Sequence, residues 1–219
     1  MKRRFDLIIF DLDGTLIDSR IDLANSVNYT RLQMGLSSLP HELIFTYIGD
    51  GAAMLIRRAL GEGLEEEDIK GALAIFMDHY RQHLLDHTVL YPGVAGTLGD
   101  FSHLQLAVLS NKPVEPSITI LDGLKVRDRF VQVYGGDSFE QKKPHPMGIE
   151  QILKDTGSAK ERALMVGDSR IDVITGQNAM VATCGVTYGL ASDTLHGLKP
   201  DFLIHRFSDL IHVVNSSNR

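Results

Sequence analysis

Six short apolar segments, separated by stretches with the apolar spacing of helices, constrain the fold of this chain most strongly. The segments are residues 7–10, 106–109, 131–134, 163–166, 181–186 and 202–204. Each is nearly continuous in apolar residues rather than alternating, which is typical of strands covered on both faces in a parallel sheet. Strands that alternate with helices predict an α/β doubly wound fold.

The long interval between the first two segments departs from this alternation. It carries helical patterns and no clear strand: one apolar stripe begins at Ile21, a second at Leu55 and a third at Ile69. Apolar residues spaced by three or four indicate helices with one buried face. We therefore expect a helical insert over residues 19–85, placed within a core formed by residues 1–18 and 86–219.

Length, composition and charge exclude several classes of protein. A chain of 219 residues suits one large domain, or one domain with a small insert. The formal net charge of −6 argues against nucleic acid or an anionic membrane as the main partner. None of the apolar segments approaches the roughly 18 residues that a membrane-spanning helix needs.

The amino-terminal residues and the cysteine content indicate a cytoplasmic protein. Asp6, Asp11 and Asp13 interrupt the apolar stretch that a secretion signal would require. Cys184 is the only cysteine, so no disulfide can form within the chain, and a reducing compartment is expected.

The most informative motif is Asp-Leu-Asp-Gly-Thr-Leu at residues 11–16, directly after the first predicted strand. Side chains alternate along an extended chain, so Asp11 and Asp13 can project to one side. Two carboxylates this close repel each other, and they need a cation, a shared proton or different roles. The alternative interpretation is that Asp11 ends the strand and Asp13 caps a turn.

Three more polar clusters follow three later strands. Ser-Asn-Lys at residues 110–112 offers a hydroxyl, an amide and an ammonium group. Lys-Lys-Pro-His-Pro at residues 142–146 can direct a lysine charge at a phosphate group. Gly-Asp-Ser-Arg-Ile-Asp at residues 167–172 brings two further carboxylates to a strand end. Taken singly, each cluster is also compatible with an ordinary polar loop or a helix cap.

The common position of the four clusters indicates one shared site. The carboxyl ends of parallel strands meet at one edge of the sheet, where doubly wound folds bind ligands. The carboxylates suit a hard cation, whereas the hydroxyl and lysine groups suit an anion. This combination predicts a small phosphate ester bound together with Mg²⁺, which uses few carboxylates and keeps phosphate oxygens and waters as ligands.

The four ordered motifs together resemble the haloacid dehalogenase-like hydrolase superfamily, and within it the phosphoglycolate phosphatase group. The resemblance spans nearly the whole chain. It implies a Rossmann-like parallel-sheet core with an α-helical cap inserted after the first strand, which agrees with the helical interval. One departure is Asn-Ala-Met at residues 178–180, where the family often has Ala-Gly.

The resemblance also implies roles for individual residues of the core. Asp11 corresponds to the nucleophile and Asp13 to the general acid and base. Lys143 and Ser110, with the adjacent Asn111, correspond to groups that bind phosphate. The implied Mg²⁺ ligands are Asp11, the backbone carbonyl of Asp13, and Asp168. Asp172 corresponds to an outer carboxylate that supports the metal or Lys143.

In the cap, Gly49, Asp50 and Gly51 are similar to the family's glycine-containing loop that closes over the substrate. A plain turn between helices explains this sequence equally well. Arg57 or Arg58 lies beside the loop, and we assign Arg58 to a carboxylate of the substrate.

The activity implied by the resemblance is Mg²⁺-dependent hydrolysis of a phosphomonoester through an aspartyl-phosphate, with 2-phosphoglycolate as the favoured substrate. A β-phosphoglucomutase-like phosphotransferase is one alternative, although such enzymes usually have Val or Ile where Thr15 stands. A non-catalytic switch protein that accepts phosphate is another. Such a switch would need no inserted cap.

Overall fold

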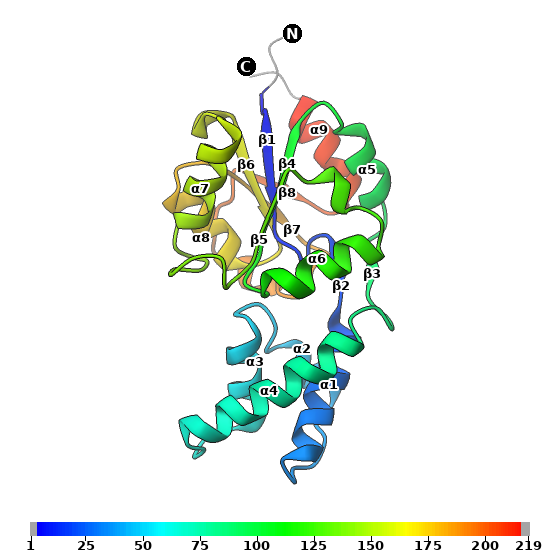
Figure 1. Ribbon diagram of the computed structural model, residues 1–219. Coiled ribbons are helices and arrows are strands. Elements are labelled where there is room, and N and C mark those ends of the chain that lie inside the picture. The colour runs from blue at the N-terminus through cyan, green and yellow to red at the C-terminus, as the bar shows by residue number, and fades with distance from the viewer. Residues whose placement is uncertain (1–3, 216–219) are drawn as a thin grey trace.

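The computed structural model describes residues 4–215, and its main body is a parallel sheet covered by helices on both faces (Figure 1). The strand order across the sheet is β5-β4-β1-β6-β7-β8, and every neighbouring pair is parallel. The strands are β1 (Leu7–Phe10), β4 (Gln105–Leu109), β5 (Gln132–Tyr134), β6 (Ala163–Gly167), β7 (Ala182–Val186) and β8 (Phe202–Ile204). All six apolar segments of the sequence form these strands, so the predicted α/β fold is confirmed.

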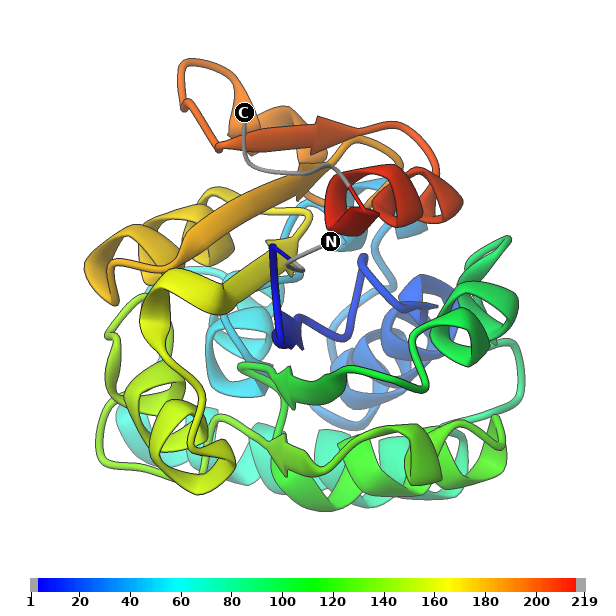
Figure 2. The ribbon, with the colours of Figure 1, turned by 90° about the horizontal axis from the view of Figure 1, so that it is seen from above.

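Alternate residues of each strand face two separate groups of helices. From β1, Ile8 and Phe10 join the larger apolar cluster, whereas Leu7 and Ile9 join the smaller one. Figure 2 shows the helices on either side of the sheet. The helices of the sheet domain are α5 (Val94–Asp100), α6 (Val114–Gly123), α7 (Met147–Thr156), α8 (Arg170–Asn178) and α9 (Leu210–Asn215). Because both faces are covered, the strands are apolar on both sides.

Four helices lie together beyond the carboxyl ends of the strands, where they cover one end of the sheet (Figure 1). They are α1 (Arg20–Gln33), α2 (His41–Phe45), α3 (Ala52–Leu60) and α4 (Glu66–Gln82). The predicted helical interval is therefore confirmed as a cap-like region. Its proposed limits, residues 19 and 85, remain a prediction, and residues 1–3 and 216–219 of the predicted core lie outside the described residues.

Two short strands that the sequence did not predict connect the cap-like region to the sheet domain. β2 (Ile17–Asp18) pairs antiparallel with β3 (Val89–Leu90). The expectation of an interval without strands was wrong here, because two-residue strands are too short to produce a periodic pattern. The pairing holds the chain entering the cap beside the chain that leaves it.

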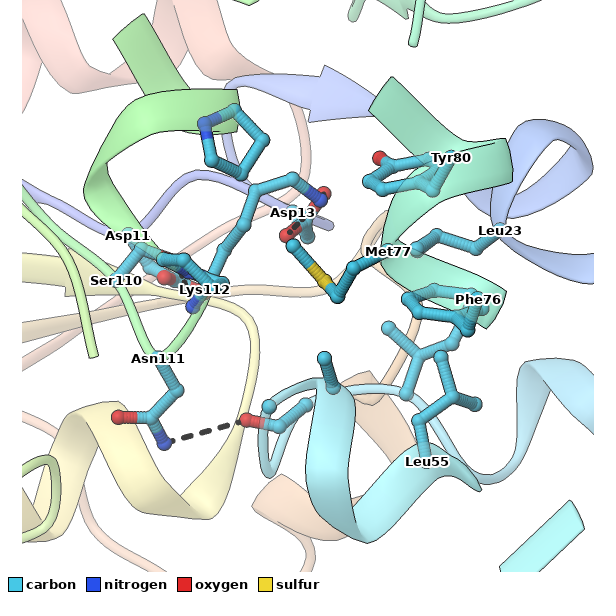
Figure 3. A pocket seen from close by; sticks show the side chains of 16 residues that line it. Asp11, Asp13, Leu23, Leu55, Phe76, Met77, Tyr80, Ser110, Asn111 and Lys112 are labelled. Carbon is cyan, nitrogen blue, oxygen red and sulfur yellow. Dashed lines mark hydrogen bonds and ion pairs between the residues drawn. The ribbon is translucent and has the colours of Figure 1, made fainter. Parts of the chain in front are cut away.

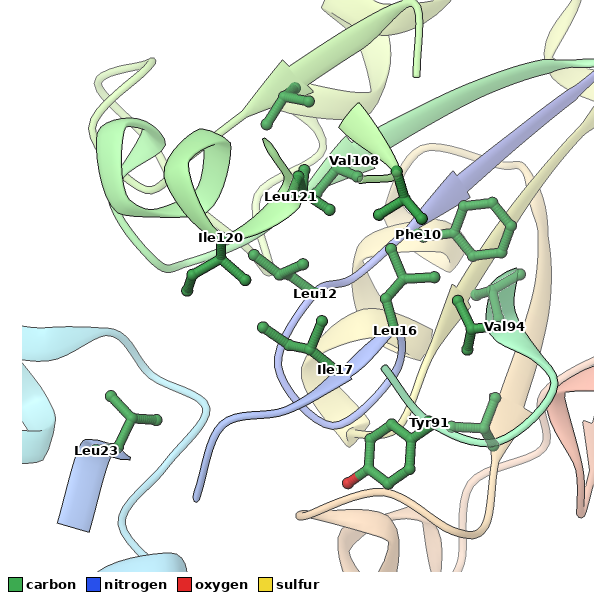
Figure 4. Packing of buried hydrophobic residues seen from close by; sticks show 14 of the residues in the cluster. Phe10, Leu12, Leu16, Ile17, Leu23, Tyr91, Val94, Val108, Ile120 and Leu121 are labelled. Carbon is green, nitrogen blue, oxygen red and sulfur yellow. The ribbon is translucent and has the colours of Figure 1, made fainter. Parts of the chain in front are cut away.

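The turn after β1 is anchored by its apolar residues. Leu12, Leu16 and Ile17 are fully buried and pack beside Val108 of β4 and Leu121 of α6 (Figure 4). Since Leu12 lies between Asp11 and Asp13, its burial fixes the backbone that carries both carboxylates.

No helix formed by residues 4–215 has both the length and the apolar character required to cross a bilayer.

Candidate active site

Lys143 lies at the centre of the charged groups that follow the strands. Its Nζ atom is 2.7 Å from Asp11 Oδ1 and 2.6 Å from Asp172 Oδ1. Lys143 is 5% exposed, so both ion pairs are shielded from solvent. Charges removed from water are stable only when they are closely paired, and this lysine is held by one carboxylate that follows β1 and one in the first turn of α8.

Three carboxylates converge beside this lysine. Asp11, Asp168 and Asp172 each offer an oxygen, and these oxygens lie within 4.8 Å of one another. Asp11 follows β1 and Asp168 follows β6, the two strands between which the chain reverses its direction across the sheet. Ligands bind at such a reversal in doubly wound folds.

The electrostatics of this cluster favour the binding of a cation. Burial raises the pKa of Asp11 to about 6, an effect that the charge of Lys143 opposes and the charge of Asp172 reinforces. Burial, together with the charges of Asp172 and Asp11, raises the pKa of Asp168 well above its usual range. A bound cation would relieve this repulsion, so the cluster can hold a metal ion.

Asp172 uses both of its oxygens within the protein. Its Oδ1 accepts from Lys143, while Oδ2 accepts from the Ser169 backbone N–H at 3.0 Å and from the Ser169 hydroxyl at 2.6 Å. These contacts form a capping box at the start of α8. Asp172 therefore contacts and orients the lysine, and its outer role at a metal site stays a prediction.

Asp168 is placed by close backbone contacts. Its Oδ2 accepts from the Ala191 N–H at 2.9 Å. Gly14 lies against the same carboxylate with φ at +88°, and a Cβ atom on Gly14 would come within 2.2 Å of Asp168 Oδ2. Only glycine combines this backbone conformation with this approach.

We expect Gly14→Ala to destabilise the protein by about 2–4 kcal/mol, from left-handed backbone strain and from displacement of Asp168. Chemical denaturation and metal titration measure the two effects. Gly157→Ala is a matched control, because Gly157 has φ at +65° but nothing lies within 4 Å of an added Cβ. The control should lose about 1 kcal/mol and keep its metal affinity. Equal metal affinity in the two variants would contradict the assignment of Asp168 as a metal ligand.

Asp13 points to a different set of partners from Asp11. Lys112 Nζ lies 3.0 Å from each Asp13 carboxylate oxygen, and the Ser19 hydroxyl also donates to Asp13 Oδ1. The Asp13 carboxylate is thus absent from the three-carboxylate cluster. Two acids separated by one residue occupy distinct environments, which is the arrangement that lets them perform different functions.

Ser110 and Asn111 line a cavity together with Asp11 and Asp13. Both are buried, and the cavity also reaches Lys112 (Figure 3). Asn111 Nδ2 donates to the Lys143 carbonyl at 3.2 Å and to the Gly49 carbonyl at 3.4 Å. The second bond joins the sheet domain to the cap-like region.

The glycine-containing loop of the cap, residues 49–51, contacts Asn111 and Lys142 of the sheet domain. Lys142 Nζ donates to the Asp50 carbonyl at 3.0 Å. A Cβ atom on Gly51, whose φ is +89°, would come within 2.9 Å of the Asn111 carbonyl. The structure thus brings Gly49, Asp50 and Gly51 to the core motifs.

Arg58 lies away from the cavity that contains Asp11. Its guanidinium pairs with the Asp50 carboxylate and donates to the Tyr47 carbonyl at 3.1 Å. Arg58 lines two other cavities instead. The expected contact between Arg58 and a substrate carboxylate therefore remains a prediction without support from this geometry.

Two residues near the site were given no individual role by the sequence analysis. Lys112 was part of a polar cluster, but its pairing with Asp13 cannot be inferred from their separation of 99 positions. Tyr80 belongs to the apolar stripe of α4, which predicts only a buried helix face. In the structure Tyr80 lines the cavity opposite Asp13.

Comparison with known proteins relates the chain to one family. The family model for haloacid dehalogenase-like hydrolases matches residues 8–186. A phosphoglycolate phosphatase from Pseudomonas putida is 40% identical over 191 residues, covering 84% of this chain and 70% of that protein. Another from Haemophilus influenzae is 35% identical and covers 98% of this chain and 100% of that protein.

A solved structure gives the same result for the fold. The crystal structure of a predicted phosphoglycolate phosphatase from Haemophilus somnus superposes with a TM-score of 0.90 at 32% identity, covering 96% of this chain and 98% of that chain. The matched segment contains all four polar motifs and the helical insert. On these grounds the chain belongs to the haloacid dehalogenase-like hydrolase family.

Proposed function

We propose that this protein is a Mg²⁺-dependent phosphomonoester hydrolase that acts through an aspartyl-phosphate on Asp11, with 2-phosphoglycolate as its substrate. The observation that carries the proposal is the placement of Asp11 beside Lys143 and Asp168 at the end of β1. The names of the relatives support the choice of substrate.

The residues present fit a magnesium ion. Asp11 and Asp168 supply two hard oxygen ligands, and burial together with the charges of neighbouring carboxylates raises the pKa values of both. With the backbone carbonyl of Asp13, they would hold Mg²⁺ and leave other positions for phosphate oxygens and water. When bound, the ion neutralises negative charge on the phosphoryl group.

Four side chains of the protein have separate roles in the reaction. Asp11 attacks phosphorus and breaks the bond to the alcohol oxygen, while Lys143 and Ser110 hold the phosphoryl oxygens. Asp13 gives its proton to the leaving oxygen. It later takes a proton from the water that breaks the aspartyl-phosphate, which restores free Asp11 and releases phosphate.

The size of the cavity supports a small substrate. Its volume is about 40 Å³, so the cavity leaves little room beside the phosphoryl position. A two-carbon leaving group suits this space better than a sugar or a nucleoside. A panel of 2-phosphoglycolate, pyrophosphate, a sugar phosphate and a nucleoside monophosphate, ranked by kcat/KM, tests the choice of substrate.

We also propose that residues 19–85 form the cap and exclude water from Asp11 while phosphoryl transfer takes place. The pairing of β2 with β3 supports this division, because it brings the two connecting segments together at one hinge. The loop contacts at Asn111 and Lys142 support a closed position over the site.

Chelation should abolish turnover. With 2-phosphoglycolate and Mg²⁺ we expect many phosphates released per protein molecule, no release in excess chelator, and recovery when Mg²⁺ is restored. Release of inorganic phosphate measures all three. Turnover that persists in excess chelator would contradict the metal. Stable phosphorylation without continued release would instead identify a phospho-accepting switch, and transfer to a sugar phosphate would identify a phosphotransferase.

A further inference from the structure

The cap side of the cavity that contains Asp11 is almost entirely apolar. Its lining from the cap includes Leu23, Ile48, Leu55, Phe76 and Met77. Tyr80 is the only hydroxyl group among the cap residues that line this cavity, and Lys112 carries the only cation among all its described lining residues. Any charge on the leaving group must therefore be met by very few polar groups.

The Tyr80 hydroxyl is buried without an acceptor for its proton. Tyr80 is 2% exposed, and its O–H donates to no acceptor within residues 4–215, whereas the neighbouring Lys112 ammonium can act only as a donor. A buried O–H without an acceptor is costly, so a ligand that supplies an acceptor is favoured at this position. The ring of Tyr80 stacks on Phe76 with centroids 5.5 Å apart, which fixes its orientation.

The ammonium group of Lys112 lies beside this tyrosine. Lys112 Nζ is 4.7 Å from the centre of the Tyr80 ring, and Figure 3 shows the two side chains approaching Asp13 from opposite sides. Burial raises the pKa of Tyr80 to about 12, with partial opposition from the charge of Lys112. Tyr80 thus keeps its proton at neutral pH and can donate it.

We propose that Tyr80 and Lys112 together bind a carboxylate on the leaving group, so that the site selects phosphate esters of small 2-hydroxy acids. This proposal rests on the proposed function, in which Asp13 contacts the leaving oxygen. In such an ester the carboxylate is one carbon away from the carbon that bears the leaving oxygen. Lys112, which is 3.0 Å from Asp13, is therefore within reach of it.

The ammonium group can serve both carboxylates. It has three N–H donors, and Asp13 is its only carboxylate partner among the described residues. Arg58 does not compete for this role, because it pairs with Asp50 and lines a different cavity. The apolar remainder of the cap wall strengthens the interaction by excluding water.

Binding measurements separate this proposal from the chemistry. In the Asp11→Asn background with Mg²⁺, calorimetry gives the Kd of 2-phosphoglycolate and of ethyl phosphate, which has a methyl group in place of the carboxylate. We expect tighter binding of 2-phosphoglycolate. Adding Tyr80→Phe should reduce this preference by about tenfold, which is typical of losing a hydrogen bond to a charged group.

Two further variants control the result. Lys112→Met in the same background should also reduce the preference by about tenfold, and it tests the site should Tyr80→Phe fold poorly. Tyr29→Phe removes a hydroxyl from an exposed cap tyrosine that does not line the cavity, and it should leave the preference unchanged. Thermal melts verify that each variant is folded.

The outcomes distinguish the two proposals. Equal affinity for both esters, or an unchanged preference in Tyr80→Phe and Lys112→Met, would overturn carboxylate recognition. A clear preference in the binding assay without turnover by the unmodified protein would instead overturn the proposed hydrolysis and leave the carboxylate site standing.

Discussion

Asp11→Asn should reduce turnover of 2-phosphoglycolate by at least about 10³-fold while the protein stays folded. The amide keeps an oxygen that can accept the hydrogen bond from Lys143, but it is no nucleophile. Removal of a nucleophile typically costs several orders of magnitude in kcat. Release of inorganic phosphate measures the loss, and a thermal melt verifies the fold.

Two additional results make this prediction decisive. Asp128→Asn, at an exposed aspartate whose side chain is 83% exposed, is the matched control and should keep full activity. Rapid quenching of the unmodified protein during turnover should trap a phosphorylated chain, and the Asp11→Asn variant should trap none. Full activity in Asp11→Asn would disprove the covalent mechanism.

Lys143→Met is expected to abolish activity and also to destabilise the metal-free protein by about 3–5 kcal/mol, the usual cost of removing one partner from a buried ion pair. Without the ammonium group, Asp11 and Asp172 are left buried beside each other. For a chain of this size the expected fall in Tm is roughly 10 °C. Differential scanning calorimetry in the presence of a chelator measures it.

The pH dependence of stability identifies the cause of the destabilisation in Lys143→Met. The pKa of Asp11 is already raised to about 6, and removal of Lys143 raises it further. Protonation of Asp11 removes one of the two adjacent negative charges. The destabilisation relative to the unmodified protein should therefore be largest above the raised pKa of Asp11 in the variant, shrink as the pH falls toward about 6, and stay constant below it, where Asp11 is protonated in both proteins. A loss independent of pH would indicate a packing defect instead.

The neighbouring lysine is the matched control for this experiment. Lys142 is exposed and donates to the Asp50 carbonyl of the cap loop rather than to a carboxylate. Lys142→Met should therefore change activity only a few-fold and leave the Tm almost unchanged. Equal losses in the two variants would contradict the distinction that the structure makes between them.

The sheet and the convergence of the four motifs could be predicted from the sequence. Apolar segments such as residues 7–10 and 163–166 are covered on both faces, and that burial requires continuous apolar sequence. Once the strands are parallel and adjacent, their carboxyl ends must share one edge. Asp11 and Asp168 therefore meet although most of the chain separates them.

The helices of the cap-like region could also be predicted from apolar periodicity. The strand pairing that connects this region to the sheet domain could not. The stripe of Ile69, Phe76 and Tyr80 indicates a helix with one buried face. The two-residue strands β2 and β3 carry no such pattern, since their pairing depends on two linkers that are brought together by the packing of the domains on either side.

The amino-acid sequence by itself determined that the four polar motifs share one edge of the sheet, because hydrophobic periodicity sets the strands and each motif comes after a strand. Only the tertiary structure decided which charge pairs with which: Lys143 with Asp11 and Asp172, and Lys112 with Asp13 beside Tyr80. Such pairings depend on distances of a few ångströms between side chains from separate strands and from the cap. Coulomb and hydrogen-bond energies change steeply over those distances, and spacing along the chain does not encode them.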